Sequence, residues 1–446
     1  MGKLTVREAA LDVLLKVAQD EAFSHLSLND MLKKQRLSGR DSRLLTEIVY
    51  GTMARRMTLD YYLAPFLKKS KKLEEWVRLL LHLSVYQMVY LDRVPDRAII
   101  HEAVTIAGKR GHKGIRGFVN GVLRSVQRQG VPSVQTIADP LEKAAIETSH
   151  PKWLLARWVA QYGFDTAVNM AEANNKPPRV TVRVNVCKTN ADEVIASLAS
   201  EGVTAVHGRL LPEALEMTSG QPFSTQSYQK GLFTAQDESA MLVTHLLDIG
   251  PNMRVLDTCA APGGKTTHIA EQLNGTGTVD AYDLHPHKVK LIAEQAARLG
   301  LKNVYPVAQD AREMKSEPLY DRILIDAPCT GFGVIRRKPD IRFRKQEADV
   351  KAIATVQQEI LRAAALALAP GGKLVYSTCT IEQEENEAVV AKFLSDHPGF
   401  KVDETMKERL PAVLQEKGRC TPLGLTILPQ DFGTDGFFMT CLTRSI

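Results

Sequence analysis

The sequence predicts a multidomain protein, with an all-α N-terminal domain, a small α+β insert and a C-terminal α/β domain. Apolar residues recur at helical spacing from Val6 to about Gln129, and they alternate as in a strand from Val180 to Val184. After Gly250, short strands and helices follow one another in turn, which is typical of a doubly wound parallel sheet. We expect domains at 1–135, 146–235 and 236–446.

The N-terminal domain is predicted to be helical throughout, because no strand alternation interrupts its pattern. We expect breaks at Gly39, Pro65, Pro95 and between Gly111 and Gly117. A linker with Pro132, Asp139 and Pro140 follows, and one further helix is predicted from Pro151 to about Asn174.

Charge is distributed unevenly along the chain. Residues 1–130 hold 23 Lys and Arg against 13 Asp and Glu, a net charge of +10, whereas the remainder carries −4. Basic clusters stand at Lys33-Lys34-Gln35-Arg36, Lys68-Lys69-Ser70-Lys71-Lys72 and Lys109-Arg110-Gly111-His112-Lys113. This asymmetry favours a polyanionic partner for the N-terminal domain, although a solvated basic surface explains the charge equally well.

The remaining composition points to a soluble protein of the reducing cytoplasm. No apolar signal core follows Met1, and the most apolar run, Leu79 to Leu91, is short and interrupted by polar residues. The six cysteines form no C-x-x-C pair, and no histidines stand at ligand spacing, so we expect neither a disulfide framework nor a metal site.

In the α/β region, polar residues stand at or just beyond the carboxyl end of each predicted strand. The strands are predicted at 254–256, 278–282, 304–308, 322–325 and 373–376, with helices at 266–273, 286–299 and 350–368 and a closing hairpin from 425 to 442. The residues are Asp257, Asp283, Asp310, Asp326 and Cys379. A single Asp there is often a helix N-cap, but five polar residues on one rim are hard to assign to capping.

The first strand leads into a loop of small residues from Asp257 to Thr266, which opens a helix. Its glycines allow close approach of the backbone, and the N–H groups of a helix start attract an anion. A Walker phosphate loop would need a glycine five residues before Gly264, where Cys259 stands, so a triphosphate site is not indicated.

Two further acids indicate a nucleoside ligand. Asp283 comes twenty residues after Gly263, the spacing at which a carboxylate accepts both ribose hydroxyls, and Asp310 could accept from an adenine amino group. A nucleoside with a small carboxylate satisfies the loop and both acids, and S-adenosylmethionine has that shape. NAD is the competitor, and the missing G-x-G-x-x-G argues against it.

Two cysteines follow neighbouring predicted strands, Cys329 after Asp326 and Cys379 after Ser377. Taken singly, a cysteine is more often a small buried hydrophobic residue. Their place beside a predicted cofactor site favours a chemical role instead.

Three ordered motifs resemble the RNA cytosine-C5 methyltransferases of the Nol1/Nop2/Sun group. They are Cys-Ala-Ala-Pro-Gly-Gly-Lys at 259–265, Asp-Ala-Pro-Cys at 326–329 and Ser-Thr-Cys-Thr at 377–380. The basic helical N-terminus resembles the NusB-type RNA-binding domain, and this fusion is similar to bacterial enzymes that act on small-subunit rRNA. The resemblance implies a Rossmann-like methyltransferase domain, S-adenosylmethionine as cofactor, and 16S rRNA, free or partly assembled, as partner, with a monomeric enzyme and no DNA or membrane partner.

The resemblance also implies roles for single residues. Cys379 would attack C6 of cytosine, Cys329 would assist product release, and Asp326 would bind the N3 or amino edge of the base as well as line the cofactor site. The cofactor would lie against Cys259, Ala260, Ala261, Pro262, Gly263, Gly264 and Lys265, with Asp283 and Asp310. Lys265 would also touch the substrate or lower the pKa of the thiol, unless it is a helix-start lysine that faces solvent. Arg183-Val184-Asn185 and Gln236-Asp237 look similar to stretches of the family, without a firm role.

The target base must be single-stranded or flipped out to reach this rim. We expect a mobile Gly331-Phe332-Gly333 segment to admit it and the basic run from Arg336 to Phe343 to contact RNA, unless that run is only a solvated loop. Three alternatives remain: the same chemistry on tRNA, a non-catalytic RNA-binding assembly factor, and a thiol redox enzyme using Cys329 and Cys379.

Overall fold

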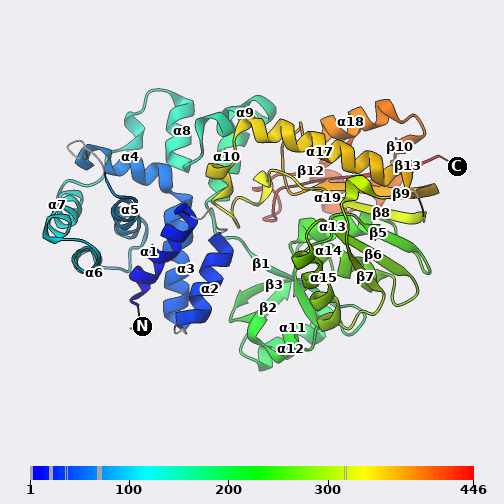
Figure 1. Cartoon of the computed structure of the whole chain (residues 1–446), viewed down its shortest axis with the longest axis horizontal. Coiled ribbons are helices and arrows are strands. Elements are labelled where there is room, and N and C mark those ends of the chain that lie inside the picture. Colours follow the sequence, from blue (N-terminus) through cyan, green and yellow to red (C-terminus); the bar gives the residue numbers. More distant parts are fainter. Residues whose placement is uncertain are drawn as a thin grey trace. The chain divides into compact units, whose positions relative to one another are not determined.

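The computed structural model describes residues 4–19, 24–35, 37, 39–67, 73–315, 317 and 319–445. The chain divides into two compact units, each described by itself (Figure 1). The first comprises residues 1–177 and 335–345, and the second comprises residues 178–334 and 346–446. The basic cluster at 68–72 and Arg36 of the first cluster lie outside the described residues.

The described part of the first unit is helical, as predicted. Its helices are α1 (Val6–Gln19), α2 (Ser24–Gln35), α3 (Gly39–Ala54), α4 (Arg56–Leu67), α5 (Glu75–Tyr90), α6 (Asp96–Arg110), α7 (Lys113–Gln129), α8 (Pro140–Thr148), α9 (Lys152–Tyr162), α10 (Phe164–Asn174) and the short α16 (Ile341–Arg344). Helix α5 is apolar along most of its length and packs against α1, α3, α4, α6 and α7, so it forms the centre of this core.

Several predicted helix boundaries were wrong. Pro65 lies inside α4, where it removes one backbone donor only two residues before the helix ends. Gly114 and Gly117 lie within α7, which begins directly after the predicted break at Gly111. Asp139 caps α8, a helix that the prediction treated as linker, and Gly163 divides the predicted 151–174 helix in two.

The second unit begins with the predicted α+β insert. Its strands β1 (Val180–Val184), β2 (Thr204–His207), β3 (Ala214–Ser219) and β4 (Phe233–Ala235) form an antiparallel sheet in the order β2-β3-β1-β4, with α11 (Ala191–Ser200) and α12 (Gln226–Gln229). On β1, Val182 and Val184 enter the core of the insert, and the intervening Arg183 is also fully buried. Because successive side chains of a strand alternate, Arg183 points to the opposite face.

The larger sheet confirms the doubly wound prediction. Strands β9 (Leu368–Thr378), β8 (Tyr320–Asp326), β5 (Arg254–Asp257), β6 (Thr278–Asp283) and β7 (Val304–Ala308) are parallel neighbours in that order. Antiparallel β13 (Phe437–Arg444) continues the sheet beyond β9 and pairs with β12 (Gly424–Ile427), which confirms the predicted hairpin; β11 (Arg419–Thr421) and β10 (Phe400–Val402) lie at this edge.

Helices cover both faces of this sheet (Figure 1). Helices α13 (Glu238–Leu246), α14 (Gly264–Gln272), α15 (Pro286–Leu299) and α19 (Ala412–Lys417) lie on one face, and α17 (Glu347–Leu366) and α18 (Glu387–Asp396) on the other. The sheet order turns at β5, since β6 lies on one side of it and β8 on the other. The loops after β5 and β8 therefore diverge, which is where such sheets bind ligands.

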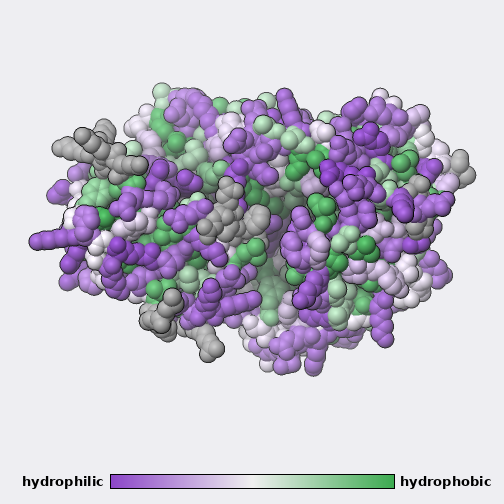
Figure 2. All heavy atoms as spheres, viewed as in Figure 1, coloured by the Kyte–Doolittle hydropathy of each residue, from purple (hydrophilic) through white to green (hydrophobic). Residues whose placement is uncertain are grey.

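Hydrophilic residues predominate on the face drawn in Figure 2, with hydrophobic residues in small groups between them. Among the helices of the described residues, none combines the length and the apolar character needed to cross a membrane.

Candidate active site

The loop after β5 is shaped by a glycine that no other residue could replace without strain. Gly263 has φ +103°, and a Cβ atom there would lie 3.2 Å from the Ile292 backbone of α15. Gly263 also stands at the N-cap of α14 without a side-chain hydrogen bond, so the first turn of that helix presents free backbone donors to a ligand.

A cavity of about 100 Å³ lies beside this loop. It is lined by Gln236, Ala240, Asp257, Cys259, Ala260, Ala261, Pro262, Gly264, Lys265 and Asp326. The structure thus brings most of the predicted cofactor residues to one place. Gln236 is noted in the sequence only for its resemblance to the family, without a firm role, and Ala240 is not identified, because both stand outside the predicted strand ends.

Asp257 is held at the base of this cavity. Its Oδ2 accepts a hydrogen bond from Thr266 Oγ1 at 2.7 Å, whereas its buried Oδ1 has no partner among the described residues. Burial raises the pKa of this carboxyl to about 7. A ligand donor that satisfied Oδ1 would remove the cost of an unpaired buried oxygen.

Lys265 and Asp326 connect the loops after β5 and β8. Lys265 Nζ donates to Asp326 Oδ2 at 2.8 Å and lies 4.9 Å from the Phe437 ring centroid. The lysine side chain is only 13% exposed, so the alternative of a solvent-facing lysine is wrong. Although burial alone would lower its pKa, the neighbouring Asp326 and Cys379 raise the pKa of Lys265. Asp326 Oδ1 accepts from Ser377 Oγ at 3.1 Å.

The two predicted cysteines lie side by side. Cys329 Sγ is 3.2 Å from Cys379 Sγ, and neither thiol is in a disulfide. The hydrogen bond to Cys379 and burial together hold the pKa of Cys329 well above its usual range, and Glu385 and Asp326 add to this shift. The cation Lys265 instead belongs to the surroundings of Cys379. The arrangement therefore favours a proton on Cys329.

Asp283 and Asp310 lie at the ends of β6 and after β7 but do not line this cavity. Asp283 Oδ1 accepts from the backbone N–H of His285 at 3.0 Å. Asp310 caps a short 3₁₀ turn and pairs with Arg312 at 2.7 Å. Both acids thus have local hydrogen bonds of the capping type, and their contact with a nucleoside stays a prediction.

The insert reaches the cofactor loop through Arg183. This fully buried side chain pairs with Glu271 of α14 through Nη2 and Oε1 at 2.9 Å. Its Nη1 donates to the carbonyl of Gly264 at 2.8 Å and to the amide oxygen of Gln236. A residue that the sequence left without a role therefore fixes the helix start beside the cavity.

The predicted mobile segment at 331–333 is a packed turn. Phe332 is fully buried, and the N–H of Gly333 donates to the Cys379 carbonyl at 3.0 Å. A Cβ atom on Gly333 would collide with the Gly436 backbone, so only glycine fits at this close approach of two loops. The expectation of a mobile gate was therefore wrong.

The basic run from Arg336 to Phe343 belongs to the first unit. Arg342 is fully buried, and burial lowers its pKa to about 9. Its Nη1 donates to Asn175 Oδ1 at 2.9 Å and lies within 3.4 Å of the carbonyls of Thr148 and Ser149. The prediction of RNA contact was wrong for Arg342, which instead satisfies carbonyls left by the turn after α8.

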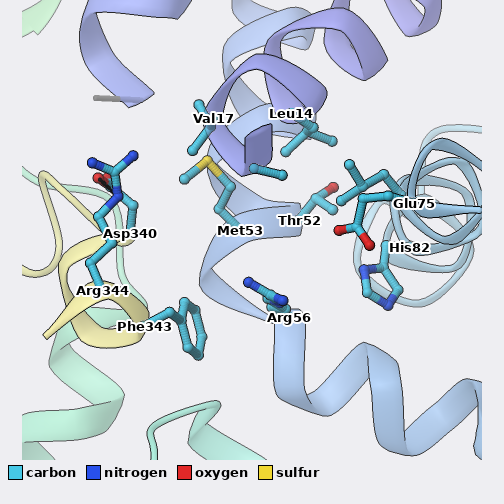
Figure 3. Close-up of a pocket in the computed structure, with 12 residues that line it drawn as sticks. Leu14, Val17, Thr52, Met53, Arg56, Glu75, His82, Asp340, Phe343 and Arg344 are labelled. Carbon is cyan, nitrogen blue, oxygen red and sulfur yellow. Dashed lines mark ion pairs between the residues drawn. The ribbon is translucent and has the colours of Figure 1, made fainter. Parts of the chain in front are cut away.

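The end of the same run lines a cavity of about 330 Å³ within the first unit (Figure 3). Phe343 lies with its ring centroid 5.7 Å from the guanidinium of Arg56, and Arg344 pairs with Asp340 at 3.4 Å. Leu14, Val17 and Met53 form an apolar wall. The acids and bases of this cavity balance one another, so its lining shows no preference for an anion.

One group among the described residues has the atoms to ligate a cation, namely Glu213, His245 and His268. Glu213 Oε1 already lies 2.6 Å from His245 Nε2, a hydrogen-bond distance, and His268 is fixed by Thr244 at 2.9 Å. These contacts account for the cluster without a metal.

The fold and the site together define a class: a methyltransferase-type α/β domain, with paired thiols beside its cofactor loop, fused to a NusB-type helical domain. Family models agree, since residues 4–128 match the NusB family, residues 150–224 the RsmF/B-like ferredoxin-like domain and residues 244–443 the 16S rRNA methyltransferase RsmB/F. The chain belongs to the RsmB/F family of 16S rRNA methyltransferases.

Whole-chain relatives support this assignment. A probable ribosomal RNA small subunit methyltransferase B of Bacillus subtilis is 47% identical and spans all of both chains. The methyltransferase B of Pseudomonas putida is 35% identical over 98% of each chain. The solved structure of PH0851 is 27% identical, covers 100% of this chain and 99% of its own, and superposes with a TM-score of 0.84. NSun6 from Pyrococcus horikoshii, at 24% identity and a TM-score of 0.60, covers 66% of this chain and 98% of its own and shares the fold.

Proposed function

We propose that this protein methylates C5 of a cytosine in 16S rRNA, with S-adenosylmethionine as methyl donor and Cys379 as covalent nucleophile. The observation that carries the proposal is the pair of thiols 3.2 Å apart, next to the ion pair of Lys265 and Asp326. The substrate follows from the family, whose members named above are small-subunit rRNA methyltransferases.

The chemistry of the cavity fits S-adenosylmethionine. The first turn of α14 suits the carboxylate of its methionine part, and the unpaired Oδ1 of Asp257 suits its ammonium group. Asp283 and Asp310 would hold the ribose and the adenine. When bound, the cofactor supplies an electrophilic methyl group.

Cytosine needs activation because its C5 is too electron-poor to attack a methyl group unaided. A thiolate at Cys379 would form a bond to C6, which moves electron density to C5 and N3. Asp326 pairs with Lys265, and Lys265 also interacts with this thiol. From this position Asp326 can hydrogen-bond the N3 or amino edge of the cytosine. Lys265 would stabilise the thiolate before attack.

Release requires that solvent take the C5 proton and that the electron pair of that C–H bond expel the Cys379 sulfur from C6. Cys329 is placed to donate its proton to the departing sulfur, because its thiol touches the Cys379 sulfur and the proton is favoured on Cys329. The two cysteines would therefore act at different stages, Cys379 in bond formation and Cys329 in release.

Single-site variants test this division. Cys379→Ala should abolish methyl transfer to undermethylated 16S rRNA, measured with labelled S-adenosylmethionine. Cys329→Ala should accumulate a protein–RNA adduct that survives denaturation. Adduct in the Cys379 variant would reverse the two roles. If the wild-type protein labels only tRNA, the assignment of 16S rRNA as substrate is wrong. If it transfers no methyl group to any RNA, the alternative of a non-catalytic assembly factor is supported.

A further inference from the structure

A buried carboxylate outside the family's three motifs joins the two cysteine turns. Glu385 lies between β9 and α18 and is fully buried. Its Oε2 accepts from the backbone N–H of Thr330 at 2.9 Å, one residue after Cys329, and its Oε1 accepts from the Thr330 hydroxyl. The carboxylate thus receives two hydrogen bonds from the turn that carries Cys329.

The same contact extends to the Cys379 turn. Thr330 Oγ1 lies 2.9 Å from Thr380 Oγ1, and because the Thr330 proton is donated to Glu385, the Thr380 hydroxyl donates to Thr330. Thr380 follows Cys379 directly. Two hydroxyls and one carboxylate therefore form a continuous link between the residues that follow the two thiols.

Gln357 of α17 also contacts both Glu385 and the turn that carries Cys329. Gln357 Nε2 donates to Glu385 Oε2 at 3.1 Å and to the Pro328 carbonyl at 2.9 Å, so it holds the residue before Cys329 as well. The Tyr376 hydroxyl donates to the backbone carbonyl of Glu385 at 2.6 Å. Burial of this order is expensive for a carboxylate that only stabilises a turn.

The charges around Glu385 are acidic or neutral. Glu382, Cys329 and Tyr376 face it, and no lysine or arginine pairs with it in the part of the chain that the structure describes. Burial raises the pKa of Glu385 to about 7, so its charge changes near neutral pH. Its negative charge acts on Cys329, whereas the cation Lys265 acts on Cys379.

We propose that Glu385 is the positioning residue of Cys329: it holds the Pro328–Thr330 turn against the Cys379 turn, and its charge keeps the proton of the thiol pair on Cys329. This inference rests on the proposed function, in which Cys329 serves product release. Glu385 touches neither base nor cofactor, and it acts through Cys329.

The amount of covalent protein–RNA adduct tests this role, because a Glu385 that only stabilised the fold would not affect release of the adduct. Glu385→Gln preserves the shape and removes the charge, and it should slow release by roughly tenfold, because the charge-assisted hydrogen bonds that hold the Cys329 turn become weaker neutral ones. A denaturing gel with 16S rRNA and S-adenosylmethionine should then show accumulated adduct. Once formed, the adduct should disappear more slowly below pH 7 in the wild type, and in Glu385→Gln its lifetime should change little over the same range.

Glu384→Gln, the same change on a partly exposed neighbour, is the matched control and should release product as the wild type does. Thr330→Val removes the hydroxyl that donates to the Glu385 carboxylate. If Glu385→Gln does not fold, Thr330→Val replaces it in the same gel and should also accumulate adduct. Loss of methyl transfer without adduct in both variants would overturn the inference.

Cys329→Ala in the same gel separates this inference from the proposed function. If Cys329→Ala accumulates adduct and Glu385→Gln does not, the role of Glu385 alone is wrong. If Cys329→Ala accumulates none, the division of labour between the cysteines fails, and the inference fails with it.

Discussion

The turns that carry Cys379 and Cys329 differ in charge, although both follow neighbouring parallel strands and both thiols are partly buried. The Cys379 turn adjoins Lys265, which is paired with Asp326. The Cys329 turn is held by Glu385, which has no basic partner among the described residues. Two thiols of the same kind are therefore placed in opposite electrostatic surroundings. This difference is the basis of the proposal that the two thiols act at different stages.

The largest effect expected from this contrast is on folding stability at the Glu385 side. The folded-state pKa of Glu385 is about 7, above its ordinary 4.5. Its stabilising contribution is therefore complete below pH 4.5 and is lost as the pH rises through 7. Relative to Glu385→Gln, the wild type should lose about 2 to 3 kcal/mol of unfolding free energy between pH 5 and pH 8.

Urea unfolding of both proteins at several pH values measures this difference. Asp257, whose pKa burial raises to about 7, titrates over the same range, but it does so in both proteins and cancels. A difference that stays constant with pH would mean that Glu385 does not change its charge in this range.

At the Cys379 side, Lys265→Met should lower the rate of adduct formation by about 30-fold, or about 2 kcal/mol, because it removes the cation beside the thiolate. Single-turnover rates across pH should also show half-maximal activity at a higher pH, since the thiolate forms less readily. Lys290→Met, on the exposed face of α15, is the control. An unchanged pH profile would remove Lys265 from activation of the thiol.

The sequence predicted the sheet and its rim because both follow from local patterns. Alternating strands and helices are visible in the chain, and the carboxyl ends of parallel strands must share one edge, so Asp326, Cys329 and Cys379 could be placed together. The 3.2 Å between the thiols and the contact of Lys265 with Asp326 confirm that placement.

Contacts between distant segments could not be predicted in this way. Arg342 stands in a run of charges that resembles a solvated or RNA-binding loop, yet it is buried against carbonyls almost 200 residues earlier. Glu385 stands in an acidic stretch that resembles a helix start. Nothing local distinguishes either residue from a surface residue, because only the tertiary fold supplies their partners.

The smallest effect expected concerns the second oxygen of Asp326, at the Cys379 side. Ser377→Ala removes a neutral donor 3.1 Å from Asp326 Oδ1 and leaves the pair with Lys265 intact. We expect about a fivefold loss in kcat/KM, near 1 kcal/mol, as for one hydrogen bond to a charged group that keeps its other partner. The loss should appear in adduct formation and not in release, since Ser377 donates to the carboxylate that we propose binds the base. Accumulated adduct in Ser377→Ala would show that Asp326 serves the release stage too, and the contrast between the two turns would then be less complete than their charges indicate.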